Sequence, residues 1–580
     1  MKKKYSSALF TTSFLSVIFL PSFVAYFLNP ENIKYFNKLV YIVSFIHFGL
    51  LLLFFLTIGK RESNKFFNSL IVIPNKINNV FFFFFLAAFT IISQSYYLQF
   101  ETISWDIPTY LVAANSVDLQ TLPYVDQWET KGPLLMYIYS LLIFLSNHSY
   151  IIFKIICDII LFLISFILFQ TFYLLNKTKI LSFFSAILFL SLFSDPEYTA
   201  EFSELFTLFF VAFAFYYYIK YKTSENFSSK RVLIVGILIS FASLTNQVAA
   251  IFAVPFLIEL KYFQKLSYKK LFIYVLGLTL PQVIFQLLYL INDYFYIYIL
   301  NYFYLPLGYT EYYENHSFSQ LKIWFKEYFY FNKWLYFSFI SIFILEVLNV
   351  RNLKKSFLNN SILYFMIFTS VSIYVLGNTN YGHHLFYFVY FSCLLMVNIV
   401  RKELTILVSI LIFLSSSIIF ASSFKQSTFN LVNLKSVEQE YPLNQLSKEI
   451  SKYINEDSKI LALDSVLILY YLDQPNFSYI VHPTNHFFDF ITKYLVEVNR
   501  INKNEIELLI SQFPDVVICS TKRVGQGGQT IFNVNFDCSE KQFNEKIYFQ
   551  LDTNKYVKNQ NIAYFYDGIK DLKVFIKINN

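Results

Sequence analysis

One loop combines residue types that can carry out group transfer. Asp106 lies near the start of residues 99–149, and Asp126, Trp128 and Lys131 follow it. A carboxylate at the mouth of a low-dielectric cavity can act as a general base. A lysine at headgroup depth can hold a phosphate as a point charge. The alternative is a solvated loop whose tryptophans anchor it at a membrane surface.

A second cluster of acids lies in residues 194–204 and precedes an apolar helix. Glu201 and Glu204 are three residues apart, which predicts one helical face directed into the end of the helix. A buried acid at such a place is costly without a function. The alternative is that these acids only cap the helix and complement its dipole.

A third cluster, residues 377–384, ends in His383 and His384 directly before another apolar run. Histidine side chains and helix N-terminal amides together can bind an anion, although polar residues are also common at an interface.

Three other charged positions lie within or beside apolar runs. Lys154 and Asp158 are four residues apart, which predicts a local ion pair, with a role near the site as the alternative. Glu259 lies near the end of an apolar run, where we expect it to be solvated.

The composition predicts a membrane protein. Of 580 residues, 56% are hydrophobic and only 14% are charged, and the mean hydropathy is +0.48. A soluble protein this apolar could not cover its surface with polar groups, and several apolar runs approach the length needed to cross a bilayer. The net charge of +8 lies in short loops between these runs, so we expect no nucleic acid partner.

Lysine and arginine counts predict the orientation. With the N-terminus inside, 22 positive residues lie in inner loops and 6 in outer loops, as expected for a cytoplasmic N-terminus. The first span reads as retained rather than as a cleaved signal. Thirteen spans then leave residues 423–580 outside, and we expect a multi-pass protein of the bacterial inner membrane. The predicted spans are 8–28, 39–58, 79–98, 150–175, 179–194, 203–221, 231–244, 247–260, 271–291, 333–349, 361–376, 384–400 and 404–422.

Two short apolar segments need a different interpretation. If residues 133–147 crossed the membrane, Lys177 and Lys179 would move outside, so we predict an interfacial or re-entrant helix there. The 99–149 loop is then wholly outside. Residues 231–244 and 247–260 form a predicted hairpin whose tip, residues 245–247, reaches the outer side.

The C-terminal region, residues 423–580, changes character because charged residues return and apolar runs shorten. Alternating short strands and helices predict a small α/β domain. We expect Cys519 and Cys538 to form a disulfide or to be two unpaired thiols. The glycines of residues 524–529 lack the spacing of a phosphate-binding loop. The predicted strands are 459–465, 477–482 and 515–520, and the predicted helices are 443–454 and 504–513.

Several motifs occur in an order that resembles the GT-C membrane glycosyltransferases. The patterns W-D-x₃-Y-x-x-A, from Trp105, and P-Y-x-D-x-W-x-x-K-G-P-L, from Pro123, resemble the first outer loop of this family. The family includes aminoarabinose transferases and protein O-mannosyltransferases. Weaker elements follow, namely E-F-x-x-L-F at 201–206, L-T-N-Q at 244–247 and Y-G-H-H at 381–384. The resemblance covers residues 79–400.

The resemblance implies a fold and a reaction. The expected fold is mainly α, with two extra N-terminal spans in residues 1–78, a catalytic transmembrane domain in 79–422 and the outer domain in 423–580. The implied reaction moves a sugar, with inversion, from a polyprenyl-phosphate-linked donor to a lipid, polysaccharide or protein acceptor. Asp106 would be the base and Glu201 a second catalytic acid. The implied phosphate- and substrate-binding residues are Lys131, His383, His384, Asp126, Glu204, Asn246 and Gln247.

Two departures from the family pattern matter. Ile107 stands where an acidic residue or glycine usually follows the first aspartate, which argues against a metal-binding acidic pair, so we expect no metal and no other cofactor. Lys131-Gly132-Pro133 replaces the usual K-P-P.

Three other functions stay open at this point. A transporter or lipid flippase usually shows internal repeats and polar residues near the membrane centre, and no repeat is evident here. An envelope-glycan polymerase or ligase of another fold would place its main polar loop late in the chain, whereas the strongest loop here is early. The last is a non-catalytic assembly protein.

Overall fold

The computed structural model describes most of the chain from residue 78 onward. The described residues are 78–102, 104–118, 121–193, 201–225, 227–312, 350–377, 382–398, 412, 416, 420, 423–520, 538, 543, 546–553, 556 and 572–578. The predicted spans 8–28, 39–58 and 333–349, and most of 404–422, lie outside them, as do residues 194–200, 378–381 and 524–529.

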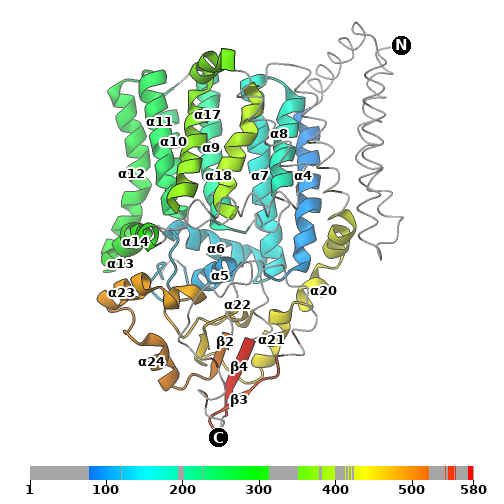
Figure 1. Ribbon diagram of the computed structural model, residues 1–580, viewed down its shortest axis with the longest axis vertical. Helices are drawn as coiled ribbons and strands as arrows, with labels where there is room; N and C mark the ends of the chain where they lie inside the picture. The colour runs from blue at the N-terminus through cyan, green and yellow to red at the C-terminus, as the bar shows by residue number, and fades with distance from the viewer. Residues whose placement is uncertain are drawn as a thin grey trace.

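Apolar helices stand side by side along the long axis of the molecule and form a bundle (Figure 1). Among the described residues, the segments 79–99, 150–176 and 268–291 are long and apolar enough to cross a membrane, and four further apolar helices are shorter. The chain is therefore an integral membrane protein, and the total of thirteen spans stays a prediction. The bundle helices are α4 (Asn79–Ser95), α7 (Tyr150–Asn176), α8 (Lys179–Leu192), α9 (Ser203–Thr223), α10 (Ser229–Thr245), α12 (Tyr268–Ile291), α17 (Val350–Gly377) and α18 (Phe386–Leu394).

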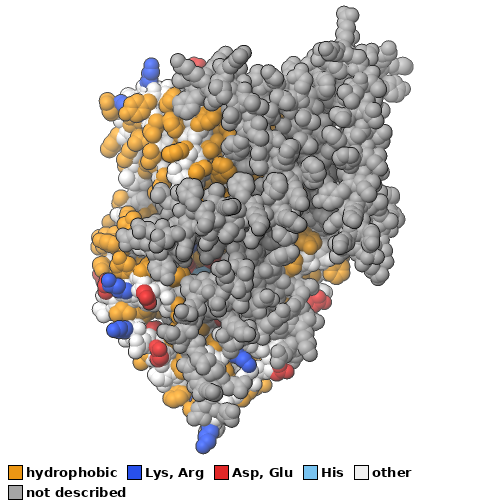
Figure 2. Space-filling model, in the orientation of Figure 1, with side chains coloured by type: hydrophobic (Ala, Val, Ile, Leu, Met, Phe, Trp, Pro, Cys, Tyr) orange, Lys and Arg blue, Asp and Glu red, His pale blue; other side chains and the backbone are white. Residues whose placement is uncertain are grey.

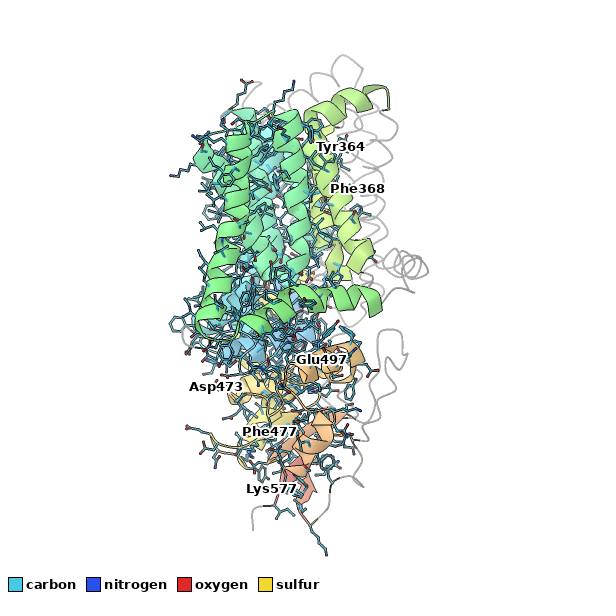
Figure 3. The ribbon with its side chains drawn as sticks, turned by 90° about the vertical axis from the view of Figure 1, so that its left-hand side faces the viewer. Tyr364, Phe368, Asp473, Phe477, Glu497 and Lys577 are labelled. Atoms are coloured by element: carbon cyan, nitrogen blue, oxygen red, sulfur yellow. A yellow bond between two sulfur atoms is a disulfide. The ribbon has the colours of Figure 1, made fainter. Side chains whose placement is uncertain are left out.

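The outer surface of the bundle is apolar where α12 lies. Phe272, Ile284 and Ile291 are exposed on this helix, and hydrophobic side chains cover the corresponding part of the space-filling view (Figure 2). In water this surface would be unfavourable, whereas lipid chains solvate it. Tyr364 and Phe368 lie on α17, within the same bundle (Figure 3).

Short helices occupy the level between the bundle and the C-terminal region, which we call the junction (Figure 1). They include α5 (Asp106–Asn115) and α6 (Pro133–Ser146). The predicted short helix at 133–147 is confirmed as α6, which ends where Asn147 adopts a left-handed conformation. Further along the chain, α13 (Phe295–Ile299), a π-helical turn (Leu300–Tyr304) and α14 (Leu305–Tyr312) lie at the same level.

The predicted hairpin at 231–260 is confirmed in outline. Helix α10 ends at Thr245, and the chain returns through a 3-10 helix (Gln247–Phe252), α11 (Ala253–Ile258) and a π-helical turn (Glu259–Phe263). Asn246 caps the returning segment, because its side chain accepts a hydrogen bond from the Val248 amide. The tip lies at the junction, because the Gly132 amide at the start of α6 donates to the Thr245 carbonyl oxygen.

The C-terminal region contains a four-stranded sheet of order β1-β2-β4-β3. Strands β1 and β2 are parallel, and the other pairs are antiparallel. The strands predicted at 459–465 and 515–520 are confirmed, and Cys519 forms a disulfide with Cys538. The elements are α20 (Leu434–Gln439), α21 (Pro442–Ile450), β1 (Ile460–Ala462), α22 (Leu467–Leu472), a 3-10 helix (Pro483–Phe487), α23 (Asp489–Glu497), α24 (Glu505–Ser511), β2 (Val516–Ser520), β3 (Tyr548–Gln550) and β4 (Leu572–Lys577).

The strand predicted at 477–482 is wrong. This segment forms only an isolated bridge, between Ile480 and Trp128 of the 99–149 loop. The Trp128 amide donates to the Tyr479 carbonyl oxygen (2.8 Å), and the Val481 amide donates to the Trp128 carbonyl oxygen (3.3 Å). The Phe477 amide donates to the Ile460 carbonyl oxygen of β1 (2.8 Å), so the segment touches the sheet only at its first residue and docks on the 99–149 loop through residues 479–481.

Glu101 also attaches the C-terminal region to the bundle. Its carboxylate accepts hydrogen bonds from the backbone amides of Leu443 (2.8 Å) and Asn444 (2.9 Å), in the first turn of α21. A carboxylate at a helix N-terminus satisfies free amides and complements the helix dipole. Burial nevertheless raises the pKa of Glu101 to about 7.

Two other charged residues differ from expectation. Glu259 is fully buried instead of solvated; it pairs with Lys222 (3.0 Å) and accepts from Ser361 on α17 (2.5 Å). This network joins α9, the π-helical turn and α17. The predicted ion pair of Lys154 with Asp158 is not formed; the Lys154 ammonium donates instead to the Phe100 carbonyl oxygen (2.6 Å).

Candidate active site

Asp106 is the first residue of α5, at the junction. Its backbone amide donates to Ser104 Oγ (3.1 Å), which helps to begin the helix, and an acid in the first turn is favoured by the helix dipole. Oδ1 lies 3.0 Å from Nε2 of His482, which comes from the C-terminal region. The Asp106 side chain is 28% exposed, so the carboxylate is both held and accessible.

The surroundings keep Asp106 ionised. Burial by itself would raise the pKa of this carboxyl, and the hydrogen bond from His482 is the largest of the effects that lower it. His383 and Lys131 contribute further, and together these groups hold the pKa of Asp106 well below its usual range. The carboxylate is therefore available at neutral pH to accept a hydrogen bond from a substrate hydroxyl.

Lys131 and Glu204 form the second part of the site. Lys131 Nζ lies 3.6 Å from Glu204 Oε1, and His384 Nε2 lies 3.7 Å from the same oxygen. Glu204 is in the first turn of α9 and only 2% exposed, whereas the Lys131 and His384 side chains are each 19% exposed. Asn246 Nδ2 also donates to Glu204 Oε1 (3.1 Å). Glu204 thus orients the Lys131 ammonium and the His384 imidazole, and both side chains stay partly accessible to a ligand.

Lys131 is charged despite its position. Burial alone would lower the pKa of its ammonium, but the carboxylates of Glu204, Asp106 and Glu129 outweigh this effect and raise it. Glu129 itself is buried, and burial raises the pKa of its carboxyl. A fixed positive charge in a poorly solvated place is suited to bind an anionic group.

The tip of the 231–260 hairpin meets the 99–149 loop next to Lys131. Gln247 Nε2 donates to the Thr130 carbonyl oxygen (2.9 Å), and the Gly132 amide donates to the Thr245 carbonyl oxygen (3.2 Å). A Cβ atom on Gly132 would lie 2.1 Å from the Leu244 carbonyl oxygen. A proline at position 132 would both clash there and lose the amide donor, so this close approach of the two backbones requires glycine.

Substituting Gly132 with alanine is therefore expected to displace Lys131 from Glu204. The obstacle is backbone, which cannot move aside cheaply, so we expect a loss of thermal stability together with a loss of activity. Thermal unfolding of the purified protein measures the first effect. Gly308→Ala is the matched control, because its Cβ would lie 3.1 Å from the edge of a Phe490 ring, a side chain that can adjust. Equal stability of the two variants would contradict the close-approach argument.

Three other predicted site residues, His383, Asp126 and Glu201, lie in three different environments. The His383 ring stacks on Phe202 at 4.1 Å between ring centres. Asp126 is exposed. Glu201 precedes α9, which begins at Ser203, so the prediction that Glu201 and Glu204 share one helical face is wrong. Within the described part of the chain, no hydrogen bond or ion pair joins the Glu201 carboxylate to the other predicted residues; it is 5% exposed and its Oε2 is unpaired.

Sequence reasoning missed His482. It follows the apolar run 477–481 and precedes Pro483, a pattern that suggested only the end of a strand. The contact with Asp106 joins residues 376 positions apart, so no local signal could have found it. Asp473 and Phe477, which precede His482 in the sequence, lie in the C-terminal region below the junction (Figure 3).

Three described residues could hold a metal ion. Glu204, His383 and His384 each offer one ligand atom, and these atoms lie within 4.8 Å of one another. Histidine and carboxylate ligands suit zinc. The Lys131 ammonium is beside the same Glu204 oxygen, so a bound cation would have to replace this ion pair or tolerate its repulsion.

Comparisons with known proteins show the fold. No family model matches the sequence, and no curated protein matches it. Among solved structures, ArnT from Cupriavidus metallidurans in the apo state is similar, with a TM-score of 0.50 and 10% identity. The same protein bound to undecaprenyl phosphate gives a TM-score of 0.51 and 10% identity; each comparison covers 76% of this chain and 92% of ArnT. The chain is therefore an integral membrane protein with an ArnT-like fold, in agreement with the GT-C type that its motifs predicted.

Proposed function

We propose that this protein is a glycosyltransferase that moves a sugar from a polyprenyl-phosphate-linked donor to an envelope acceptor. The observation that carries the proposal is the meeting of Asp106, Lys131, Glu204 and His384 at the junction of an ArnT-like fold. An ionised carboxylate and a fixed cation are the two groups that such a transfer needs. The ArnT structure with undecaprenyl phosphate supports a lipid-linked phosphate as the anionic ligand.

The proposed reaction is a direct displacement with inversion. The acceptor hydroxyl donates a hydrogen bond to the Asp106 carboxylate, and its oxygen attacks the anomeric carbon. The bond from that carbon to the phosphate oxygen breaks, and the electron pair stays on the phosphate. Asp106 accepts the hydroxyl proton, and Lys131 and His384 stabilise the released polyprenyl phosphate. The products are the glycosylated acceptor and the lipid phosphate.

The amphipathic donor agrees with this place in the fold. Its polyprenyl chain requires the apolar surroundings of the bundle, and its phosphate and sugar require the polar junction. The distribution of lysine and arginine supports a junction on the extracytoplasmic side of the bacterial inner membrane. The C-terminal region and the acceptor would then meet in the periplasm or its equivalent.

Envelope glycolipids provide the test. Mass spectrometry of membranes with and without the protein is expected to show a missing sugar and an accumulated polyprenyl-phosphate-sugar when the protein is absent. Purified protein in lipid nanodiscs should then transfer the sugar from this donor to an extracted acceptor. Loss of the sugar from one leaflet without any transfer by the purified protein would indicate a flippase and contradict the proposal.

The same assay tests metal independence. We expect EDTA to leave transfer unchanged, because the Lys131 ammonium already supplies a positive charge beside Glu204. Loss of transfer on chelation, with recovery on adding zinc, would instead assign a metal to Glu204, His383 and His384.

A further inference from the structure

The segment that carries His482 is held firmly against the 99–149 loop. Gln127 Nε2 donates to the Asn476 carbonyl oxygen (3.0 Å), and the Asn476 amide donates to Gln127 Oε1 (3.0 Å). Trp128 is completely buried and forms the bridge with Ile480. His482 follows two residues later, so its position relative to Asp106 is determined by contacts of both segments.

The hydrogen bonds of His482 define its tautomer. Nδ1 accepts a hydrogen bond from the backbone amide of Thr484 (3.2 Å), because a backbone N–H can only donate. Thr484 Oγ1 lies 2.9 Å from the same nitrogen. The neutral ring therefore carries its proton on Nε2 and donates it to Asp106 Oδ1. His482 is at the same time the N-cap of the 3-10 helix Pro483–Phe487, which fixes the ring further.

We infer that His482 is a positioning residue for Asp106, so that the C-terminal region completes the active site. The inference rests on the proposed function, in which Asp106 contacts the acceptor hydroxyl. The Nε2–H bond holds Oδ1 and sets the plane of the carboxylate. The second oxygen, Oδ2, is then directed to the acceptor. An orienting partner of this kind determines how closely the base approaches the reacting hydroxyl.

The charges around Asp106 determine what happens when His482 is removed. The titratable groups that interact with the carboxylate are His482 from the C-terminal region, Lys131 and Glu129 from the 99–149 loop, His383 and His384 before α18, and Tyr110 on α5 itself. A hydrogen bond donated to the ionised carboxylate favours that form and so lowers the pKa of the carboxyl. Loss of the hydrogen bond from His482 should therefore raise the pKa of Asp106. As the pH is lowered, activity should then begin to fall at a higher pH than in the wild type.

Variants of the full-length protein in nanodiscs test the inference. The sugar donor in this assay is the polyprenyl-phosphate-sugar that accumulates in membranes without the protein. His482→Ala is expected to lower kcat by about 100-fold with little change in the KM for the donor, and to move the acid limb of the pH profile upward. His482→Gln should recover much of the activity, because its amide can accept from Thr484 and donate to Asp106. If His482 only held the two regions together, glutamine would not be expected to restore kcat and the acid limb of the pH profile.

A matched control separates positioning from docking. Asn115 Nδ2 donates to Asp473 Oδ1 (2.7 Å), an exposed contact between the same two regions. Asn115→Ala should change neither kcat nor the pH profile. Wild-type activity of His482→Ala, or equal losses in the alanine and glutamine variants with lowered thermal stability, would overturn the inference. An active Asp106→Asn would instead overturn the proposed function, whatever the His482 variants do.

Discussion

Asp106→Asn is expected to reduce kcat for sugar transfer by about 100-fold or more, the usual contribution of a positioned base. Asparagine keeps the size of the side chain, and its Oδ1 can still accept the Nε2–H of His482. Its amide nitrogen cannot accept a proton from the acceptor hydroxyl. The local structure should therefore survive while the chemical step is lost. Transfer from the polyprenyl-phosphate-sugar donor in nanodiscs is the measurement.

The control for this variant is an exposed carboxylate outside the site. Glu497 ends α23 in the C-terminal region and is exposed (Figure 3), so Glu497→Gln should retain wild-type transfer. The two variants should unfold at similar temperatures. Unchanged transfer by Asp106→Asn would remove Asp106 from the chemistry and leave its contact with His482 as a structural one.

Lys131→Met should affect both activity and stability. Removing a preorganised charge that stabilises a leaving phosphate is expected to lower kcat by about 100- to 1,000-fold. Removing it also leaves the buried Glu204 carboxylate without its ammonium partner, which is expected to destabilise the fold by about 3 kcal/mol. This value is at the low end for a broken buried pair, because Asn246 and Ser203 still donate to Glu204.

The double variant Lys131→Met, Glu204→Gln separates the two effects. It removes both charges and leaves no unpaired carboxylate, so the thermal unfolding temperature should return toward that of the wild type. Transfer should stay as low as in the single variant, because the phosphate still lacks its cation. If the double variant regained activity together with stability, Lys131 would serve the fold and not the phosphate.

Much of the architecture follows from local features of the sequence. Long apolar runs predict membrane helices because unpaired backbone groups are excluded from lipid, and α4, α7 and α12 occur where these runs lie. The charge of Lys177 and Lys179 was enough to predict that residues 133–147 form a short separate helix. The spacing of Asp106 and Lys131 in the 99–149 loop already resembled a GT-C site.

Only the tertiary structure decided which residues meet. Glu201 and Glu204 are equivalent in a helical pattern, but α9 begins at Ser203 and directs only Glu204 to Lys131. The apolar alternation of 477–482 cannot reveal whether the backbone pairs within the sheet or with Trp128. His482 reaches Asp106 because two regions distant in sequence dock through buried polar contacts. Periodicity describes one segment and its burial, whereas a site depends on partners that long-range packing brings together.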